Sequence, residues 1–297
     1  MPWSVTFPIS GVHVCPLVPF LAALAISLFT SMGGVSGAFV LLPFQMSVLG
    51  FTSPAVTPTN HLFNVVAIPS GVYRYAREGR MVWPLTLAIL LGTLPGVLLG
   101  SWARIRYLPD PRHFKLFVGL VLLLIGVRLA VKVIRPTAGT AVPPAPGRVR
   151  TVRFDLHRIE YEYAGAVHGI SSPALFLLTA VVGMIGGAYG VGGGAIIAPF
   201  LVSIFDLPVH SIAGATLSGT CITSFVGVLF FAAAPAFGAP RLSPDWLLGG
   251  LFGLGGLCGM YGGARLQRRV AARWIEGILA VGVCTLALGY IIGFVGS

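Results

Sequence analysis

The chain has 297 residues, of which 56% are hydrophobic and only 9% are charged. A soluble domain carries about 25% charged residues, so this composition excludes an ordinary soluble protein and predicts a polytopic membrane protein. The net charge of +11 would suggest nucleic-acid binding in a soluble protein, but all Lys and Arg lie within residues 74–158 and 241–273, at segment ends and in loops. We therefore expect the lipid bilayer, and no nucleic acid, as a partner.

The first half begins with an interrupted apolar run. Residues 16–32 and 35–50 are two apolar arms separated by Gly33 and Gly34. Each arm is roughly 25 Å long as a helix, which is shorter than the ~30 Å hydrocarbon core, so a hairpin or broken pair is predicted. A basic loop is expected at 104–115. Three further spans are expected at residues 56–73, 82–103 and 117–134.

A polar segment separates the two halves. Residues 135–165 are rich in Pro, Gly and Arg and are expected to form a linker that is flexible in part. The predicted organisation is therefore a first membrane repeat at 15–134, this basic linker, and a second membrane repeat at 166–296.

The second half begins with a glycine-rich run. Residues 183–200 contain seven glycines, and each costs about 1 kcal/mol relative to Ala in a helix interior. We predict that the helix breaks near Tyr189–Gly194 and restarts. Lipid cannot form hydrogen bonds with the unpaired backbone groups of such a break. The restarted helix directs its positive N-terminal end into the break, and this positive end favours binding of an anion. The remaining spans are expected at residues 209–234, 246–264 and 275–295.

The two halves share an ordered pattern of glycines. The stretch from Gly34 to Phe44 matches the stretch from Gly190 to Phe200, with Gly, Val, Gly, Pro and Phe at corresponding positions. The order of these matches indicates an internal duplication. A second series pairs Gly92, Gly96, Gly100, Gly119 and Gly126 with Gly255, Gly259, Gly263, Gly282 and Gly289. Within the span at 82–103, Gly92, Gly96 and Gly100 are expected to allow kinks and close helix packing.

The positions of Lys and Arg predict the topology. If both broken pairs enter and leave on one side, most of the 19 Lys and Arg lie on the face that holds the linker. The positive-inside rule favours this arrangement over a fully spanning second pair. It places both termini outside the inner (cell) membrane and residues 135–165 in the cytoplasm. The predicted fold is all-α, with two inverted repeats, each a Gly-rich re-entrant pair plus three transmembrane helices.

Candidate substrate-binding residues lie at the breaks and on the span after each break. Asn60 and Asn64 are one helical turn apart, and Thr216 and Thr220 occupy the corresponding positions in the second half. An amide within a span needs a partner, which is either the oxygens of an anion or a neighbouring helix and broken backbone. The full set is Gly34, Ser36, Gly37, Asn60, Asn64, Gly190, Gly192, Gly193, Thr216 and Thr220.

Other polar residues have two interpretations each. His61 is a candidate for a coupling proton or an anion contact, or is a neutral histidine bonded to a carbonyl. Ser31 and Tyr189 either contact solute or cap the breaks locally. The arginines at span ends are expected to extend to the lipid headgroups, although one of them is a candidate for attracting anions at a pathway mouth. These arginines are Arg74, Arg104 and Arg265.

The paired motifs resemble those of a known family. Gly34-Val35-Ser36-Gly37 and Gly190-Val191-Gly192-Gly193-Gly194, each followed by Pro, Phe and a polar span, resemble the TauE/SafE family of sulfite exporters over about residues 17–295. The first motif departs from the family pattern, with Ser36 where the second has Gly192. The stretch from Pro58 to Val66 looks like one branch of the family. The resemblance implies a permease for sulfite or organosulfonates such as sulfoacetate.

The sequence lacks common enzymatic motifs. It contains no phosphate-binding loop, no His-Glu-x-x-His and no Cys-x-x-Cys, and none of its eight acidic residues lies mid-span. We expect no enzyme activity, no metal and no cofactor. The prediction is a secondary transporter of small anions that alternates access around a central site formed by the two breaks. The alternatives are an anion channel and a non-transporting membrane subunit or enzyme.

Overall fold

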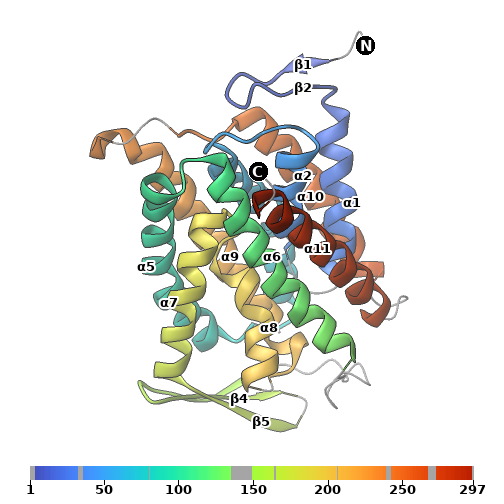
Figure 1. Cartoon of the computed structure of the whole chain (residues 1–297). Helices are drawn as coiled ribbons and strands as arrows, with labels where there is room; N and C mark the ends of the chain where they lie inside the picture. The colour runs from blue at the N-terminus through green and yellow to red at the C-terminus, as the bar shows by residue number, and fades with distance from the viewer. Residues whose placement is uncertain are drawn as a thin grey trace.

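The computed structural model describes residues 4–32, 36–79, 81–134, 149–163, 165–205, 207–238, 242–266 and 272–295. Within these ranges the chain is a bundle of helices with two small antiparallel sheets (Figure 1). Two predicted features lie outside the described residues, namely Gly34 of the first break and residues 135–148 of the linker.

The described part of the first half contains a short N-terminal hairpin and six helices. The hairpin pairs β1 (Val5–Thr6) with β2 (His13–Val14). The helices are α1 (Leu17–Met32), α2 (Ala38–Ser47), α3 (Val56–Ala67), α4 (Pro69–Arg77), α5 (Trp83–Tyr107) and α6 (Pro111–Ile134).

In the second half, the residues that the structure describes form a three-stranded sheet and five α-helices. The strands are β3 (Arg150–Phe154), β4 (Arg158–Tyr163) and β5 (Ala166–Ser171). The helices are α7 (Ser172–Tyr189), α8 (Gly193–Phe205), α9 (Val209–Ala233), α10 (Trp246–Leu266) and α11 (Ala272–Val295), and a 3-10 turn η2 (Ala234–Phe237) follows α9.

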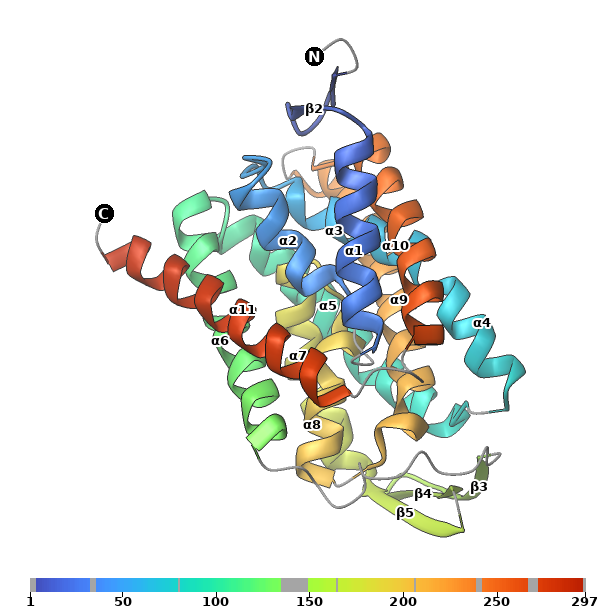
Figure 2. The same cartoon turned by 90° about the vertical axis from the view of Figure 1, so that its right-hand side faces the viewer.

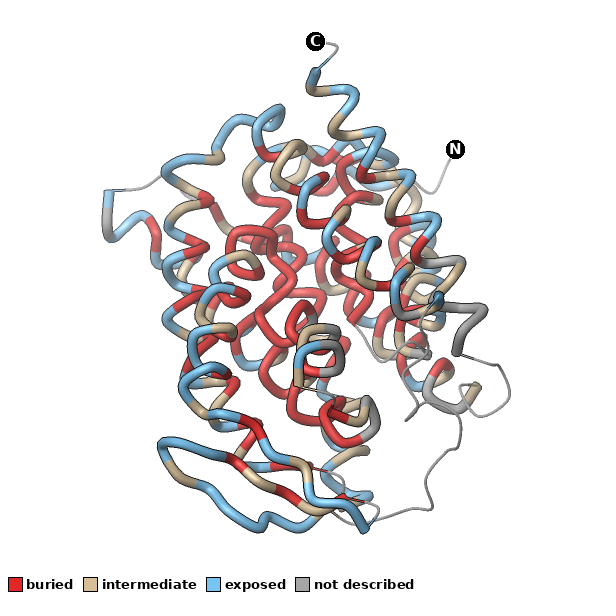
Figure 3. Tube along the Cα trace, turned by 60° about the horizontal axis from the view of Figure 1, so that its bottom comes forward, coloured by how far each residue is buried: buried red, intermediate tan, exposed pale blue. Residues whose placement is uncertain are grey.

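The described helices have the length and surface of a multi-pass membrane protein. Buried residues gather in the middle of the bundle, and exposed positions face outward (Figure 3). Large apolar side chains such as Leu91 and Leu99 of α5 are among the exposed ones, as expected where lipid is the solvent. Among the described residues, four helices are long and apolar enough to cross a bilayer: Trp83–Tyr107, Pro111–Val131, Ser172–Tyr189 and Ser211–Ala236.

The pair α7/α8 is a hairpin that returns to the end of the bundle where it began. Ser172, at the start of α7, donates from its hydroxyl to the carbonyl of Asp155 beside the sheet (2.9 Å). Ser211, in the first turn of α9, hydrogen-bonds Tyr161 of β4 (2.8 Å). The chain therefore leaves the sheet through α7 and is back at the sheet when α9 starts.

The pair α1/α2 forms a second hairpin at the opposite end. The carboxylate of Asp245, just before α10, accepts hydrogen bonds from the backbone N–H and hydroxyl of Ser10, ahead of α1 (2.9 and 2.8 Å). The backbone N–H of the same Asp245 donates to Thr59 in the first turn of α3 (2.9 Å). The two hairpins thus approach each other from opposite ends of the bundle (Figure 2).

Glycine stripes join each hairpin to the other half of the chain. A Cβ added at Gly96 of α5 would lie 2.3 Å from the carbonyl oxygen of Ala180 in α7, and one at Gly259 of α10 would lie 2.3 Å from that of Leu24 in α1. The close packing predicted for Gly92, Gly96 and Gly100 is confirmed, and Gly259 packs in the same way. Because α5 packs on α7 and α10 packs on α1, the partners are exchanged between the halves. The inverted repeat itself stays a prediction.

Two expected boundaries were wrong. The span predicted at 56–73 is divided at Ile68, because Pro69 has no backbone N–H with which to continue the helix. The basic loop predicted at 104–115 is mostly helix, since α5 continues to Tyr107 and α6 begins at Pro111. Arg104 consequently lies inside a helix rather than in a loop.

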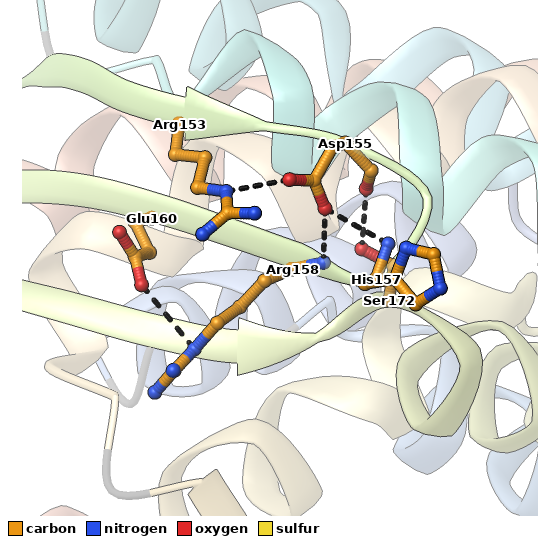
Figure 4. Close-up of polar contacts among 6 residues, drawn as sticks. All are labelled: Arg153, Asp155, His157, Arg158, Glu160 and Ser172. Carbon is orange, nitrogen blue, oxygen red and sulfur yellow. Dashed lines mark hydrogen bonds and ion pairs between the residues drawn. The ribbon is translucent and has the colours of Figure 1, made fainter.

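The sheet β3–β4–β5 was not expected, because the linker was predicted to be partly flexible. The alternating residues Ile159, Tyr161 and Tyr163 of β4 are buried on one face, a period of two that marks a half-buried strand. Asp155 holds the turn between β3 and β4. Its carboxylate accepts hydrogen bonds from the backbone N–H groups of His157 and Arg158 (2.9 and 2.7 Å) and pairs with Arg153 (Figure 4). The Arg158 N–H is the largest cause of the lowered pKa of Asp155.

Candidate functional site

Asn60 of α3 connects the two helix breaks. Its amide nitrogen donates to the carbonyl of Ala38, at the start of α2, and to the carbonyl of Gly190, after α7 (both 3.0 Å). Its side-chain oxygen accepts from the amide of Gln45 (3.1 Å). The side chain is fully buried, so one amide satisfies backbone groups from both hairpins.

Asn64, one turn later on α3, extends the same bridge. Its amide nitrogen donates to the carbonyl of Val191 (2.8 Å) and to the hydroxyl of Ser224 on α9 (3.1 Å), and its oxygen accepts from the hydroxyl of Ser36 (2.6 Å). Both amides therefore use all of their N–H groups on protein atoms. The interpretation of Asn60 and Asn64 as partners of the broken backbone is observed directly, whereas their role in anion binding stays a prediction.

The second break lies where the sequence predicted it. Gly190 and Gly192 have φ values of 90° and 75°, which side chains rarely adopt. The N–H groups of Gly190, Val191 and Gly192 all converge on the carbonyl of Gly186 (2.9, 3.0 and 3.3 Å). The N–H of Gly193, at the start of α8, donates to the hydroxyl of Thr223 (3.3 Å). A Cβ at Gly193 would lie 2.5 Å from the Thr93 side chain, so this glycine also serves helix packing.

The first break has a different environment. Ser36 caps α2, because its hydroxyl accepts the N–H of Ala38 (3.3 Å). Gly37 has a helical φ of −66°, and a Cβ there would lie 3.1 Å from the Ser27 hydroxyl oxygen and 3.3 Å from that of Thr30. Tyr189 links the second break to the first, since its hydroxyl donates to the carbonyl of Phe39 (2.8 Å).

Thr216 and Thr220 do not reproduce the bonding of the asparagines. Their hydroxyls donate within α9, to the carbonyls of Ala213 (3.1 Å) and Thr216 (2.9 Å). Both threonines pack against α8, because a Cβ at Gly194 would meet the Thr216 carbonyl and the Thr220 hydroxyl. The structure therefore places them beside the second break, with their hydroxyl protons already used.

Several buried polar groups in the described residues have no hydrogen-bond partner. Such groups are rare in folded proteins and indicate strain, function or a missing ligand. The groups on α1 lie around Gly37. The others belong to α3 itself or to side chains that contact α3. They are the hydroxyls of Ser27 and Thr30, the Gln45 oxygen Oε1, both ring nitrogens of His61, and Nη1 and Nη2 of Arg104.

His61 is buried between α3 and α9. A Cβ at Gly227 would lie 2.8 Å from its Nε2 atom, and its ring lies 6.4 Å from the ring of Phe231. The backbone of Gly187 also faces the ring, but no hydrogen bond of normal geometry forms to either nitrogen. Both interpretations of His61 therefore stay predictions.

Arg104 corrects the expectation that the arginines extend to the headgroups. Its side chain is 0% exposed, its Nε donates to the Thr57 hydroxyl (3.1 Å), and its guanidinium carbon lies 3.6 Å from the centroid of the Phe114 ring. Arg74 of α4 instead pairs with Glu78, the residue that follows this helix (2.9 Å). The side chain of Arg265 lies outside the described residues. Ser31 bonds the Leu28 carbonyl of its own helix (3.3 Å), which is local capping.

Comparison with known proteins agrees with this architecture. The family model described as sulfite exporter TauE/SafE matches residues 19–290. The probable membrane transporter protein y4hK of Sinorhizobium fredii is 25% identical over 88% of this chain and 92% of its own length. The probable membrane transporter protein YjnA of Bacillus subtilis is 22% identical over 88% of this chain and 93% of its own. No solved structure matches the chain significantly.

Proposed function

Because the chain belongs to the sulfite exporter TauE/SafE family, and is therefore a membrane transporter, we propose that it is a secondary permease for small sulfur-containing anions such as sulfite or organosulfonates. The relatives are named only as probable membrane transporters, so the identity of the solute is part of the proposal. Enzymatic activity is not part of it.

The observation that carries the proposal is the set of unpartnered polar groups around the two breaks. The hydroxyls of Ser27 and Thr30 and the guanidinium of Arg104 are hydrogen-bond donors, and all are buried without a complete set of partners. Ser27 and Thr30 face Gly37 at the N-terminus of α2, where positive partial charge gathers, and Arg104 carries a full positive charge, so both environments favour a small anion. A structural core would be expected to pair them internally.

The proposed mechanism is alternating access around the place where the two hairpins meet. The hairpins approach from opposite ends and are bridged by Asn60, Asn64 and Tyr189, so a movement of one hairpin must change the contacts of the other. In a transporter built from inverted repeats, the substrate site lies at the repeat interface. In this proposal the anion replaces some of these bridging hydrogen bonds, and Gly37, Gly190, Gly192, Gly193, Thr216 and Thr220 lie around it. Gly34, outside the described residues, stays a candidate from the sequence alone.

The topology of the proposal has both termini outside and the linker in the cytoplasm. The N-terminal hairpin and the sheet β3–β4–β5 lie at opposite ends of the bundle (Figures 1 and 2), which is compatible with the positive-inside argument. Single cysteines are introduced at Ser4 and at Arg150 in a Cys-free background. A membrane-impermeant reagent should label the cysteine at position 4 only from outside and the cysteine at position 150 only from inside. Labelling of Ser4→Cys from the cytoplasm would reject this orientation.

Flux measurements in liposomes test the transport class. We expect saturable counterflow of sulfite or sulfoacetate by the purified chain, with empty liposomes as the control. Conductance that does not saturate would favour the anion channel, and absence of flux with every tested anion would favour a non-transporting subunit.

His61 is proposed as a coupling or solute-contacting residue. It is the buried titratable group whose ring nitrogens lack partners, and imidazole exchanges protons near neutral pH. His61→Gln retains polarity and removes the titration. If protons are coupled through this ring, the variant should lose the dependence of flux on a pH gradient while it still exchanges the anion at equal pH.

A further inference from the structure

The guanidinium of Arg104 is buried without a charge partner in the described residues. Arginine carries five N–H donors. Of these, the Nε–H bonds Thr57 at 3.1 Å, whereas Nη1 and Nη2 have no hydrogen bond. The one carboxylate among the fully buried side chains, Asp245, is occupied by backbone groups and the hydroxyl of Ser10. Four N–H donors and one positive charge are thus left in the interior.

The helix that carries Arg104 brings it to the second break. Gly92, Gly96, Gly100 and Arg104 are spaced four residues apart, on one face of α5. The three glycines pack successively along α7, from Thr179 to Ala188. The next position on this face, Arg104, therefore lies where α7 ends.

Thr57 supplies an independent link to the same place. Its hydroxyl accepts from Arg104, and its carbonyl is the atom that a Cβ on Gly190 would meet at 2.6 Å. One residue thus contacts both the arginine and the break. Phe114 covers the guanidinium from the side of α6, with 3.6 Å between the guanidinium carbon and the ring centroid, and this contact fixes the plane of the fork.

The energetic argument favours a ligand. A buried charge without a partner strongly destabilises a fold, even after local relaxation. The negative end of the α7 dipole and the stacked Phe114 ring each offset only a part of this cost. The cost that remains favours binding of an anion that completes the hydrogen bonds of Nη1 and Nη2.

We propose that the Nη groups of Arg104 bind the oxyanion head of the transported solute, as its principal charge partner. The inference rests on the proposed anion transport and names the residue that recognises the charge. A planar fork matches two oxygens of a sulfite, sulfonate or carboxylate group, so the site selects oxyanions over single-atom halides. The purely structural alternative is that Arg104 only stabilises the end of α7.

The test compares Arg104→Gln and Arg104→Lys with Arg106→Gln. Arg106 lies on the same helix but is exposed, so its substitution removes equal charge from the surface. The full chain is purified in a neutral detergent without anionic lipid. Sulfite and sulfoacetate binding is measured by calorimetry and thermal shift, and counterflow is measured in liposomes.

We expect wild type and Arg106→Gln to bind and to gain thermal stability with either anion. Arg104→Gln should bind at least about 30-fold more weakly, since truncating one partner of a buried charge pair has this scale of effect. Its stability without anion should equal or exceed that of wild type, whereas a structural role predicts a loss. Arg104→Lys should also bind more weakly, because an ammonium cannot form the fork.

The outcomes separate the two proposals. If wild type exchanges no anion, the proposed function fails. If wild type exchanges sulfite or sulfoacetate and Arg104→Gln does so equally well, only the role of Arg104 is wrong. Should Arg104→Gln not fold, undiminished affinity of Arg104→Lys would overturn the inference. Protection of wild type by phosphatidylglycerol vesicles, but by neither free anion, would assign the group to a lipid phosphate and overturn it as well.

Discussion

The break between α7 and α8 and the break between α1 and α2 carry corresponding motifs, but their surroundings differ. At the second break, the carbonyls of Gly190 and Val191 are bonded by amides from α3, in the other half of the chain. At the first break, Gly37 faces the hydroxyls of Ser27 and Thr30, which have no partner. Matching motifs therefore do not carry matching roles, and the groups without partners are the better guide to a binding site.

Substitution of the corresponding polar residues should give the largest contrast between the halves. Asn60→Leu leaves the carbonyls of Ala38 and Gly190 and the amide of Gln45 without a partner. Each such buried group costs about 1–3 kcal/mol, so we expect a loss of several kcal/mol in the free energy of unfolding. Thr216→Val removes one bond within α9 and should cost below about 1 kcal/mol.

Chemical unfolding in detergent measures both values, and transport of the folded fraction is compared afterwards. Equal destabilisation by Asn60→Leu and Thr216→Val would show that the two halves are bonded alike after all, and that the contrast between the breaks is wrong.

Adding one methyl group at each break should distinguish a loss of stability caused by backbone strain from a loss of transport caused by filling the space of the solute. Gly190→Ala places a Cβ at a φ of 90° and 2.6 Å from the Thr57 carbonyl, which should destabilise the protein by about 1–3 kcal/mol. Gly37→Ala has a helical φ and only side chains nearby, so its stability should change by less than about 1 kcal/mol. Its transport should nevertheless fall, because the methyl group faces Ser27 and Thr30.

Gly71→Ala is the matched control, since its Cβ would make an ordinary contact of 3.6 Å with Leu217. Thermal unfolding and liposome flux are measured for all three variants. Wild-type flux by a well-folded Gly37→Ala would remove the first break from the solute pathway.

Two serines near the first break should behave oppositely. The Ser36 hydroxyl bonds Asn64 and caps α2, so Ser36→Ala should destabilise by about 1–2 kcal/mol. The Ser27 hydroxyl is buried without a partner, and Ser27→Ala should be neutral or slightly stabilising. If Ser27 donates to the solute, this variant should show a raised KM with unchanged folding. A loss of stability in Ser27→Ala would instead point to a structural role.

The smallest effect is expected far from both breaks, at the turn of the sheet. The pKa of Asp155 is lowered, chiefly by the Arg158 N–H. A carboxyl with a lowered pKa stabilises the fold above its ordinary value of 3.8 and loses this contribution as the pH falls through its lowered folded value. Asp155→Asn should therefore weaken the sheet slightly at neutral pH and reduce the acid sensitivity of hydrogen exchange in β3 and β4, with transport unchanged. Altered transport would connect the sheet to the solute pathway.

Much of the membrane architecture could be predicted from apolar runs and glycines. The break after Tyr189 was found because seven glycines are too many for one helix, and the stripe from Gly92 to Gly100 was expected to allow close packing. The sheet was missed because the Pro- and Arg-rich linker obscured the alternation from Ile159 to Tyr163. That alternation was the signal that could have found β4.

The burial of Arg104 could not be predicted from its position at a span end, where arginines usually reach the headgroups. A signal was present in the four-residue spacing from Gly92 through Gly100, which places Arg104 on the face that packs against another helix. Whether Asn60 and Asn64 connect the two breaks was also left open, because one sequence does not show which helix packs against an amide side chain.

The exchanged glycine stripes have a consequence for synthesis. Helix α1 ends at Met32, but its packing partner α10 begins only at Trp246. At ~5–20 residues per second, α1 waits roughly 10–40 s for that partner to emerge from the ribosome. Its sequence has no charged residue, which allows it to wait in lipid. Pausing translation between these two helices should therefore leave a first hairpin that is inserted but sensitive to protease, until the glycines of α10 arrive.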